Sequence, residues 1–332
     1  FRSRRFPITF LKFGSVVIFC LMCASVVYVL VYGKVLDWYD APSICWATVS
    51  AVCFTAMFIY MEKRQYSPYF LMDIFKLRSI RMGILLFLLL MIFNSSAMFV
   101  NVFTGVGMKI DNWQNASLGN WTMLGYFIGC IIAVMLGSRG VHLKYLFSLG
   151  FVLIGLSALF MYFEVQTSGL YERMKYPVII RATGMMLLYS LTAVHANQRM
   201  PYKYLSTWIC IMLTVRMVMG PGIGTALYTN VMQHRQQHYV TRFAQDRDLL
   251  NPEVAASYSQ TVKGMQYQGK SGQEAEQMAA MSAKGSVQVQ ATLSAVKEMS
   301  GWTFYGCMAC AVFFLLFPWK KRKLEPFAAT VS

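Results

Sequence analysis

The chain has 332 residues, of which 57% are hydrophobic and only 13% are charged, and its mean hydropathy is +0.46. An average soluble domain carries about 25% charged residues. The composition leaves too little polar surface to cover a water-soluble globule, and it excludes disordered, collagen-like and disulfide-scaffold proteins. The net charge of +16 does not indicate nucleic-acid binding, because the basic residues lie in small groups between apolar runs. The sequence therefore predicts a protein of the lipid bilayer.

Eight runs of mostly apolar residues are long enough to cross a membrane as helices, which takes about 20 residues. None of them shows the alternation of a membrane β-barrel strand. We therefore expect an all-α membrane protein with eight transmembrane helices. The predicted spans are 13–33, 43–61, 83–105, 118–137, 143–163, 176–196, 204–228 and 300–319.

Basic residues are divided unequally between the two sides of these spans. If the first residues are cytoplasmic, the segments on their side hold 17 Lys and Arg, and the short loops on the other side hold only 4. This bias follows the positive-inside rule, so both chain ends are expected in the cytoplasm. The predicted order is a cytoplasmic linker (1–12), a transmembrane hairpin (13–61), a basic cytoplasmic loop (62–82), a six-helix unit (83–319) and a cytoplasmic tail (320–332).

Segment 229–299 lies on the outer side in this arrangement, and it is polar and poor in large aliphatic residues. Good helix formers make up its first and last parts, with interruptions at 251–252 and 269–272. We expect helices that continue the flanking spans and project outward. His234 and His238 have the spacing of metal ligands on a helix, but no acidic or cysteine residue is near them in sequence, so neither a metal nor a cofactor is expected.

Polar side chains gather in three of the last six spans, at 83–105, 176–196 and 204–228. Because polar groups are costly in hydrocarbon, these helices are expected to face a wet cavity or the interior of the bundle. Span 143–163 carries few polar residues, which favours a lipid-facing helix. The six-helix unit divides into 83–163 and 176–319, as in transporters built from repeats of three helices.

No predicted span contains Asp or Glu, and Arg181 and Arg216 are the two basic residues that lie well inside one. An arginine at the bilayer centre costs about 2.5–3.5 kcal/mol on insertion scales, so each needs partners or water. Arg181 either lines or gates a cavity, where it could bind an anionic group, or it donates to backbone carbonyls at a helix end. Arg216 is expected to have a conformational role tied to the glycine-rich bend at 220–224.

Two sets of candidate residues follow from this pattern. Methionines and aromatic residues suit contact with small amphipathic or hydrophobic molecules, although core packing also explains many of them. The substrate-cavity candidates are Asn94, Asn101, Tyr126, Arg181, Met185 and Tyr189. The helix-bend candidates are Arg216, Gly220, Pro221, Gly222 and Gly224.

Four motifs occur in order along the chain, followed by a long outer loop and a final helix. They are residues 33–38 (GKVLDW), 68–78 (PYFLMDIFKLR), 180–184 (IRATG) and 216–225 (RMVMGPGIGT). Their order and spacing resemble those of the major facilitator drug:proton antiporters with fourteen spans, the EmrB/QacA branch. In that family two extra helices separate two six-helix halves. The resemblance implies that 13–61 is this linker pair and that 83–319 is the C-terminal transporter half.

The resemblance also implies a function, namely multidrug efflux by alternating access in the bacterial inner membrane. The N-terminal six-helix half, with the acidic residues that couple export to protons, would be missing from this stretch of sequence, and a periplasmic adaptor would bind at 229–299. Two alternatives stay open: a complete membrane scaffold without transport activity, and a small carrier that forms its pathway as a homodimer. No set of catalytic residues points to an enzyme.

Overall fold

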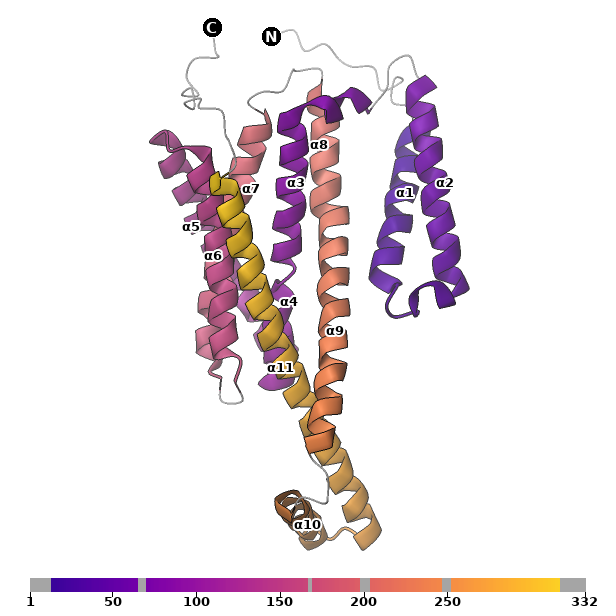
Figure 1. Cartoon of the computed structure of the whole chain (residues 1–332), viewed down its shortest axis with the longest axis vertical. Helices are drawn as coiled ribbons and strands as arrows, with labels where there is room; N and C mark the ends of the chain where they lie inside the picture. Colours follow the sequence, from indigo (N-terminus) through magenta and orange to yellow (C-terminus); the bar gives the residue numbers. More distant parts are fainter. Residues whose placement is uncertain (1–12, 65–69, 167–168, 198–203, 247–251, 317–332) are drawn as a thin grey trace.

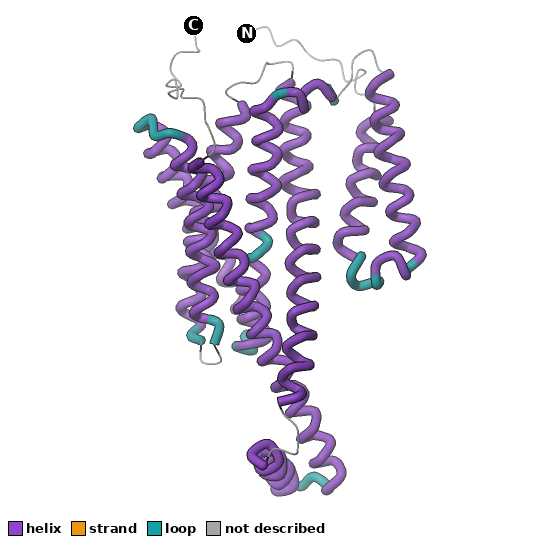
Figure 2. Tube along the Cα trace, in the orientation of Figure 1, coloured by secondary structure: helices purple, strands orange, loops and turns teal. Residues whose placement is uncertain are grey.

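The computed structural model describes residues 13–64, 70–166, 169–197, 204–246 and 252–316. Within these ranges the chain is helical with short connecting loops and contains no β-strand (Figure 2). Eight of the helical segments are long and apolar enough to cross a membrane. The predicted all-α membrane fold with eight spans is therefore confirmed. The predicted linker 1–12 and tail 320–332 lie outside the described residues.

The first two helices form a hairpin at one side of the molecule (Figure 1). α1 (Phe13–Tyr32) and α2 (Pro42–Arg64) are joined by a tight turn in which Asp37 and Trp38 have positive φ angles of 51° and 55°. α1 contacts the long helix α9 (Gly220–Asp246) as well as α2. The hairpin therefore packs on the other helices through α1.

The six spans that follow the hairpin form a bundle, and α9 belongs to one of them. Its further elements are α3 (Arg78–Asn94), α4 (Ala97–Val102), α5 (Asn112–Ser138), α6 (Leu143–Glu164), α7 (Lys175–Asn197), α8 (Leu205–Thr214) and α11 (Gly272–Leu316). α3 and α4 belong to one span, as do α8 and α9. α7 is the central helix, because it packs against α3, α5 and α6.

α6 packs more than half of its residues against the bundle, but one apolar face of the helix, with Leu149, Leu156 and Phe163, is exposed, so lipid contact of span 143–163 stays a prediction for that face. Phe147, Phe151 and Ile154 are fully buried, and both phenylalanines contact the ring of Phe314 in α11. α6 is covered by α7 on one side and by α11 on the other. Lipid tails and apolar side chains are equally apolar, so a helix without polar groups can have one face in each environment.

Two pairs of glycines bring helices of the two predicted three-helix repeats into close contact. Gly125 and Gly129 of α5 face α7, where a Cβ at Gly125 would lie 2.5 Å from a backbone carbonyl oxygen. Gly220 and Gly224 of α9 face α3, where a Cβ at Gly220 would lie 2.5 Å from a side-chain carbon. α5, the second helix of the first repeat, thus packs on α7, the first helix of the second repeat. In the same way α9, in the second span of the second repeat, packs on α3, in the first span of the first repeat, and both contacts use glycines four residues apart. Reciprocal contacts of this kind are compatible with repeats related by a pseudo-two-fold axis.

The two ends of the bundle differ in charge. One of them, termed the basic end, contains the end of α2, the start of α3 and the α5–α6 loop (Figure 1). The charged residues described there are the basic Lys63, Arg64, Lys76, Arg78, Arg81, Arg139 and Lys144 and the acidic Glu62 and Asp73. The short loops and helix ends at the opposite end carry Lys34, Lys109, Arg173 and Lys175 together with Asp37, Asp40, Asp111, Glu164 and Glu172.

α9 and α11 continue beyond that opposite end as a projecting pair of helices (Figure 1). α10 (Pro252–Tyr267) packs on α11 at the far tip. The described residues of 229–299 are termed the stalk, and they are helical apart from a turn at 268–271. At its root, Arg235 forms a two-point ion pair with Glu298, with nitrogen–oxygen distances of 2.8 and 2.6 Å. The pair ties α9 to α11 where they leave the bundle.

Replacing Gly125 by Ala should destabilise the protein, because the added Cβ would lie 2.5 Å from the carbonyl oxygen of Ile179 and push α5 away from α7. Overpacking of this kind costs about 1–3 kcal/mol. The matched control is Gly119→Ala on the same helix, where an added Cβ meets nothing within 4 Å. Thermal unfolding in detergent, followed by circular dichroism, should show a lower midpoint for Gly125→Ala only. Equal midpoints for both variants would contradict the close α5–α7 contact.

Candidate functional site

A stripe of three residues runs along one face of α7. Arg181, Met185 and Tyr189 follow at intervals of four, which places them on the same side of a helix. Their side chains are half-buried, whereas Thr183 and Leu187 on the opposite side are buried. α7 therefore has one face closed by its own bundle and one face that is partly open. Arg181, Met185 and Tyr189 are termed the α7 stripe.

Arg181 is held where α3 ends. α3 stops at Asn94, and Ser95 and Ser96 form a turn before α4 begins. Arg181 Nη1 donates to the side-chain oxygen of Asn94 at 2.8 Å and to its backbone carbonyl at 3.3 Å. Helix ends leave carbonyl oxygens without partners, so this break supplies the acceptors that hydrocarbon lacks. Of the two interpretations of Arg181, donation to a carbonyl at a helix end is thus present in the structure.

The guanidinium of Arg181 is only partly satisfied. Its Nε is buried without a hydrogen-bond acceptor, and its Nη2 donates to none of the described residues. A buried donor without an acceptor costs about 1–3 kcal/mol. Within the described part of the chain Arg181 also forms no ion pair. The site therefore retains a positive charge and two unused donor nitrogens.

Arg216 lies over the ring of Tyr189. Its Cζ is 4.1 Å from the ring centroid, and its Nη1 donates to the Tyr189 hydroxyl. Phe87 of α3 makes an edge-on contact with the same ring at 5.6 Å. Both side chains are half-buried, and cation–π contacts stabilise by about 0.5–1 kcal/mol at exposed sites and by about 2 kcal/mol when desolvated. The tyrosine ring therefore takes the place of a counter-ion for Arg216.

Arg216 also lies in a π-helical turn, Val215–Met219, that joins α8 to α9. At the end of this turn the N–H of Gly220 donates to the carbonyl of Val215, five residues earlier. Pro221 follows directly and has no N–H for an ordinary helical hydrogen bond. The wider turn accommodates the proline, so α8 and α9 remain one span. Of the other helix-bend candidates, Gly220 and Gly224 pack on α3 and Gly222 faces α1.

The last two cavity candidates lie in different places. Tyr126 of α5 joins the α7 stripe, because its hydroxyl is 3.9 Å from the sulfur of Met185 and its side chain is 38% exposed. The side chain of Asn101 is exposed on α4 and makes no hydrogen bond to the stripe among the described residues. A continuous helix would have placed Asn101 on the face of Asn94, seven residues earlier, but the turn after Asn94 redirects α4. The structure thus separates Asn101 from the α7 stripe, and its place in a cavity stays a prediction.

Sequence reasoning did not identify the aromatic residues beneath Tyr189. Phe87 contacts both Tyr189 and Trp208, the latter at 6.3 Å between ring centroids. Phe87 and Trp208 are fully buried, and the indole N–H of Trp208 has no acceptor among the described residues. Large aromatic residues occur throughout these spans, so their positions alone gave no signal.

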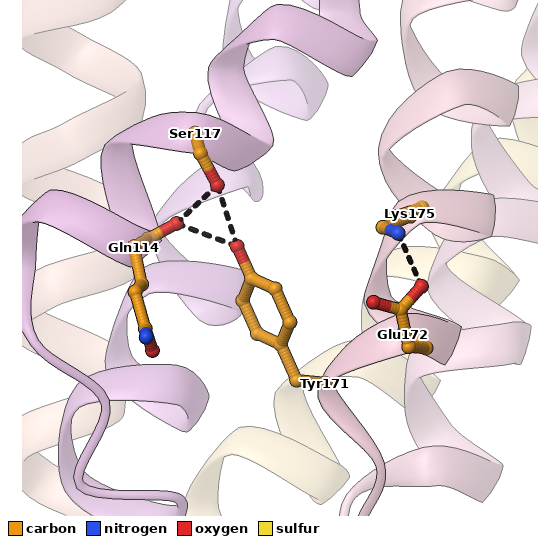
Figure 3. A network of polar contacts seen from close by, with 5 residues as sticks. All are labelled: Gln114, Ser117, Tyr171, Glu172 and Lys175. Atoms are coloured by element: carbon orange, nitrogen blue, oxygen red, sulfur yellow. Dashed lines mark hydrogen bonds and ion pairs between the residues drawn. The ribbon is translucent and has the colours of Figure 1, made fainter.

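A second polar group, also missed from the sequence, fixes the start of α7 to α5 (Figure 3). Tyr171 donates its hydroxyl to the carbonyl of Gln114 at 2.5 Å and lies 2.8 Å from the hydroxyl of Ser117. Lys175 and Glu172 form an ion pair beside it. Most of these side chains are exposed, and they lie at the end of the bundle near the stalk root. They hold α7 in place relative to α5, away from the α7 stripe.

Comparison with protein-family models gave no match to this chain, and comparison with curated proteins gave none either. The described residues contain no group of three or more His, Cys, Asp or Glu that could hold a metal ion. The fold itself defines an all-α protein with eight helices able to span a membrane. Its most distinctive polar feature is the α7 stripe, where side chains of α3, α5 and the α8–α9 span meet α7.

Replacing Tyr189 by Leu should destabilise the fold more than replacing it by Phe, because Phe keeps the ring over Arg216 and loses only the hydroxyl. The expected losses are about 2 kcal/mol or more for Tyr189→Leu and about 1 kcal/mol for Tyr189→Phe. Tyr145→Leu is the matched control, since Lys144 lies 4.6 Å from that ring at an exposed position. Unfolding by SDS titration, followed by tryptophan fluorescence, measures all three. A loss for Tyr145→Leu as large as that for Tyr189→Leu would contradict a buried role for the Arg216 contact.

Proposed function

We propose that this chain forms a linker hairpin and one six-helix half of a secondary-active multidrug efflux carrier in the bacterial inner membrane. Small amphipathic or hydrophobic molecules move by alternating access between this half and a second six-helix bundle. The observation that carries the proposal is the exchanged packing of the two three-helix repeats around α7. In carriers with inverted repeats, the substrate site lies at the repeat interface near the middle of the membrane.

The α7 stripe supports this proposal by its position. α7 is the first helix of the second repeat, and Arg181 and Met185 contact α3 and α5 of the first repeat. Tyr189 contacts Arg216, at the π-helical turn between α8 and α9. Helix segments of this kind occur frequently at functional sites. A molecule bound at the stripe would therefore touch both repeats at once.

The chemistry of the stripe suits apolar cargo of varied shape. Met185 and Met186 are half-buried, and Tyr126 is exposed beside them. Methionine side chains are flexible and polarizable, and aromatic rings offer flat apolar surface. Such surfaces can repack around different ligands, which is what promiscuous recognition requires.

The charge distribution supports the proposed orientation. The basic end would face the cytoplasm, and both chain ends with it, according to the positive-inside rule. The predicted spans contain no Asp or Glu, so a protonatable carboxylate would have to come from the second bundle. Proton antiport is therefore proposed for the complete carrier with both bundles, and not for this chain alone.

The stalk is the proposed docking site for a periplasmic adaptor. It projects from the end opposite the basic end (Figure 1). It also carries large side chains open to solvent, including Tyr267 at 91% and Met281 at 72% exposure.

Dye export by the complete product of the reading frame that encodes this chain tests the proposal. In cells without their major efflux pumps, expression should lower the accumulation of Nile red, and a protonophore should abolish the difference. Met185→Trp should weaken export because it fills the space beside the stripe. Met57→Trp, at an exposed position of α2, is the matched control and should leave export unchanged.

Two other outcomes would contradict the proposal. If the protein is folded in the membrane and Nile red accumulation does not change, a scaffold without transport activity is favoured. If the 332-residue chain alone exports the dye from liposomes as a dimer, it is a complete homodimeric carrier.

A further inference from the structure

The α7 stripe holds a positive charge that no described group neutralises, and this bears on which molecules can bind there. Arg181 and Arg216 both lie in spans whose predicted ranges contain no Asp or Glu. Arg216 is covered by the ring of Tyr189, whereas Arg181 has only the two oxygens of Asn94. We propose that Arg181 binds an anionic group of the cargo, so that the site selects amphipathic organic anions such as hydrophobic carboxylates. This inference rests on the carrier function proposed above.

The hydrogen bonds of Arg181 leave one side of its guanidinium available. Asn94 uses Nη1, and the N–H groups of Nε and Nη2 lie along the other edge. Nε is enclosed without an acceptor, whereas Nη2 is not closed off from the surface and donates to no described residue. Two parallel N–H groups on one guanidinium edge match the two oxygens of a carboxylate. Nη2 is therefore the nitrogen that a carboxylate reaches first.

The neighbours of Arg181 on the stripe define the rest of the ligand. Met185 lies about one helical turn from Arg181 along α7 and contacts Tyr126 of α5, and Tyr189 lies about two turns from Arg181. Eight residues of helix separate Arg181 from Tyr189, a distance of about 12 Å along the axis. An acidic group at Arg181 would therefore place an apolar body of one or two rings against Met185 and Tyr126. A cationic molecule in the same place would face an unneutralised arginine.

The competing explanation is that a carboxylate on a helix of the second bundle pairs with Arg181. In that case the charge serves assembly or gating, and it affects every cargo alike. The two explanations predict different dependence on cargo charge. This difference decides between them.

The experiment measures export of three dyes by the complete reading-frame product in inside-out vesicles: anionic fluorescein, neutral Nile red and cationic rhodamine 6G. Arg181→Gln should raise the KM for fluorescein by about tenfold or more, because it removes a charge-assisted hydrogen bond. The KM for Nile red should stay unchanged. Arg181→Lys should recover part of the fluorescein affinity, since it restores the charge without the planar edge. Arg173→Gln, an exposed arginine paired with Glu164, is the control and should change none of the values.

Binding of fluorescein to the purified protein, measured by fluorescence anisotropy, separates this inference from the proposed function. Tighter binding to the wild type than to Arg181→Gln supports the anion site even if no dye is exported, an outcome that overturns only the carrier function. The proposal of an anion site is contradicted if Arg181→Gln changes export of all three dyes equally. It is also contradicted if the wild type and Arg181→Gln bind fluorescein with the same affinity. Size-exclusion profiles of the variants show that each is folded. If Arg181→Gln aggregates, the comparison of Arg181→Lys with wild type decides in the same way.

Discussion

Hydrocarbon supplies neither water nor hydrogen-bond acceptors, and the arrangement of α3 and α7 follows from this constraint on Arg181. The charge can be accommodated only if another part of the chain offers oxygens at the same depth. The end of α3 at Asn94 does so with a side-chain amide and a backbone carbonyl. Ser95 and Ser96 donate their hydroxyls to the carbonyls of Met91 and Phe93, which also accept the backbone N–H groups of the same two serines, and these bonds stabilise the turn. The register between α3 and α7 is thereby fixed.

Close packing then completes the bundle around α7. In a membrane the hydrophobic effect does not drive helices together, because lipid tails are as apolar as the side chains they would replace. Association depends on close approach, and glycines at the α5–α7 and α3–α9 contacts remove the side chains that would keep these helices apart. α6 adds a layer of buried phenylalanines between α7 and α11. One face of α7 is closed in this way, and the face with Arg181, Met185 and Tyr189 stays partly open.

The sequence predicted the spans well because span length and apolarity are local properties, and the extension of α9 and α11 into the stalk follows from local helix propensity. Properties that depend on helix rotation and contact were harder to predict. Which residues of α6 are buried could not be read from an apolar helix, and the turn at Ser95 and Ser96 interrupts the helical periodicity that related Asn101 to Asn94. Arg181 and Arg216 stood out as intramembrane charges. Their partners, Asn94 and the ring of Tyr189, became apparent only when the helices were placed side by side.

The structure gives α7 one closed face and one partly open face, and the proposed function requires that water reaches the open face. Thiol labelling tests it most directly, with Met185→Cys and Leu187→Cys introduced separately into a variant whose eight native cysteines are replaced by alanine. A water-soluble maleimide applied to the protein in its native membrane should label Met185→Cys and leave Leu187→Cys unmodified. If both positions are protected, or if Leu187→Cys reacts as fast as Met185→Cys, then α7 has no open polar face and the account is contradicted.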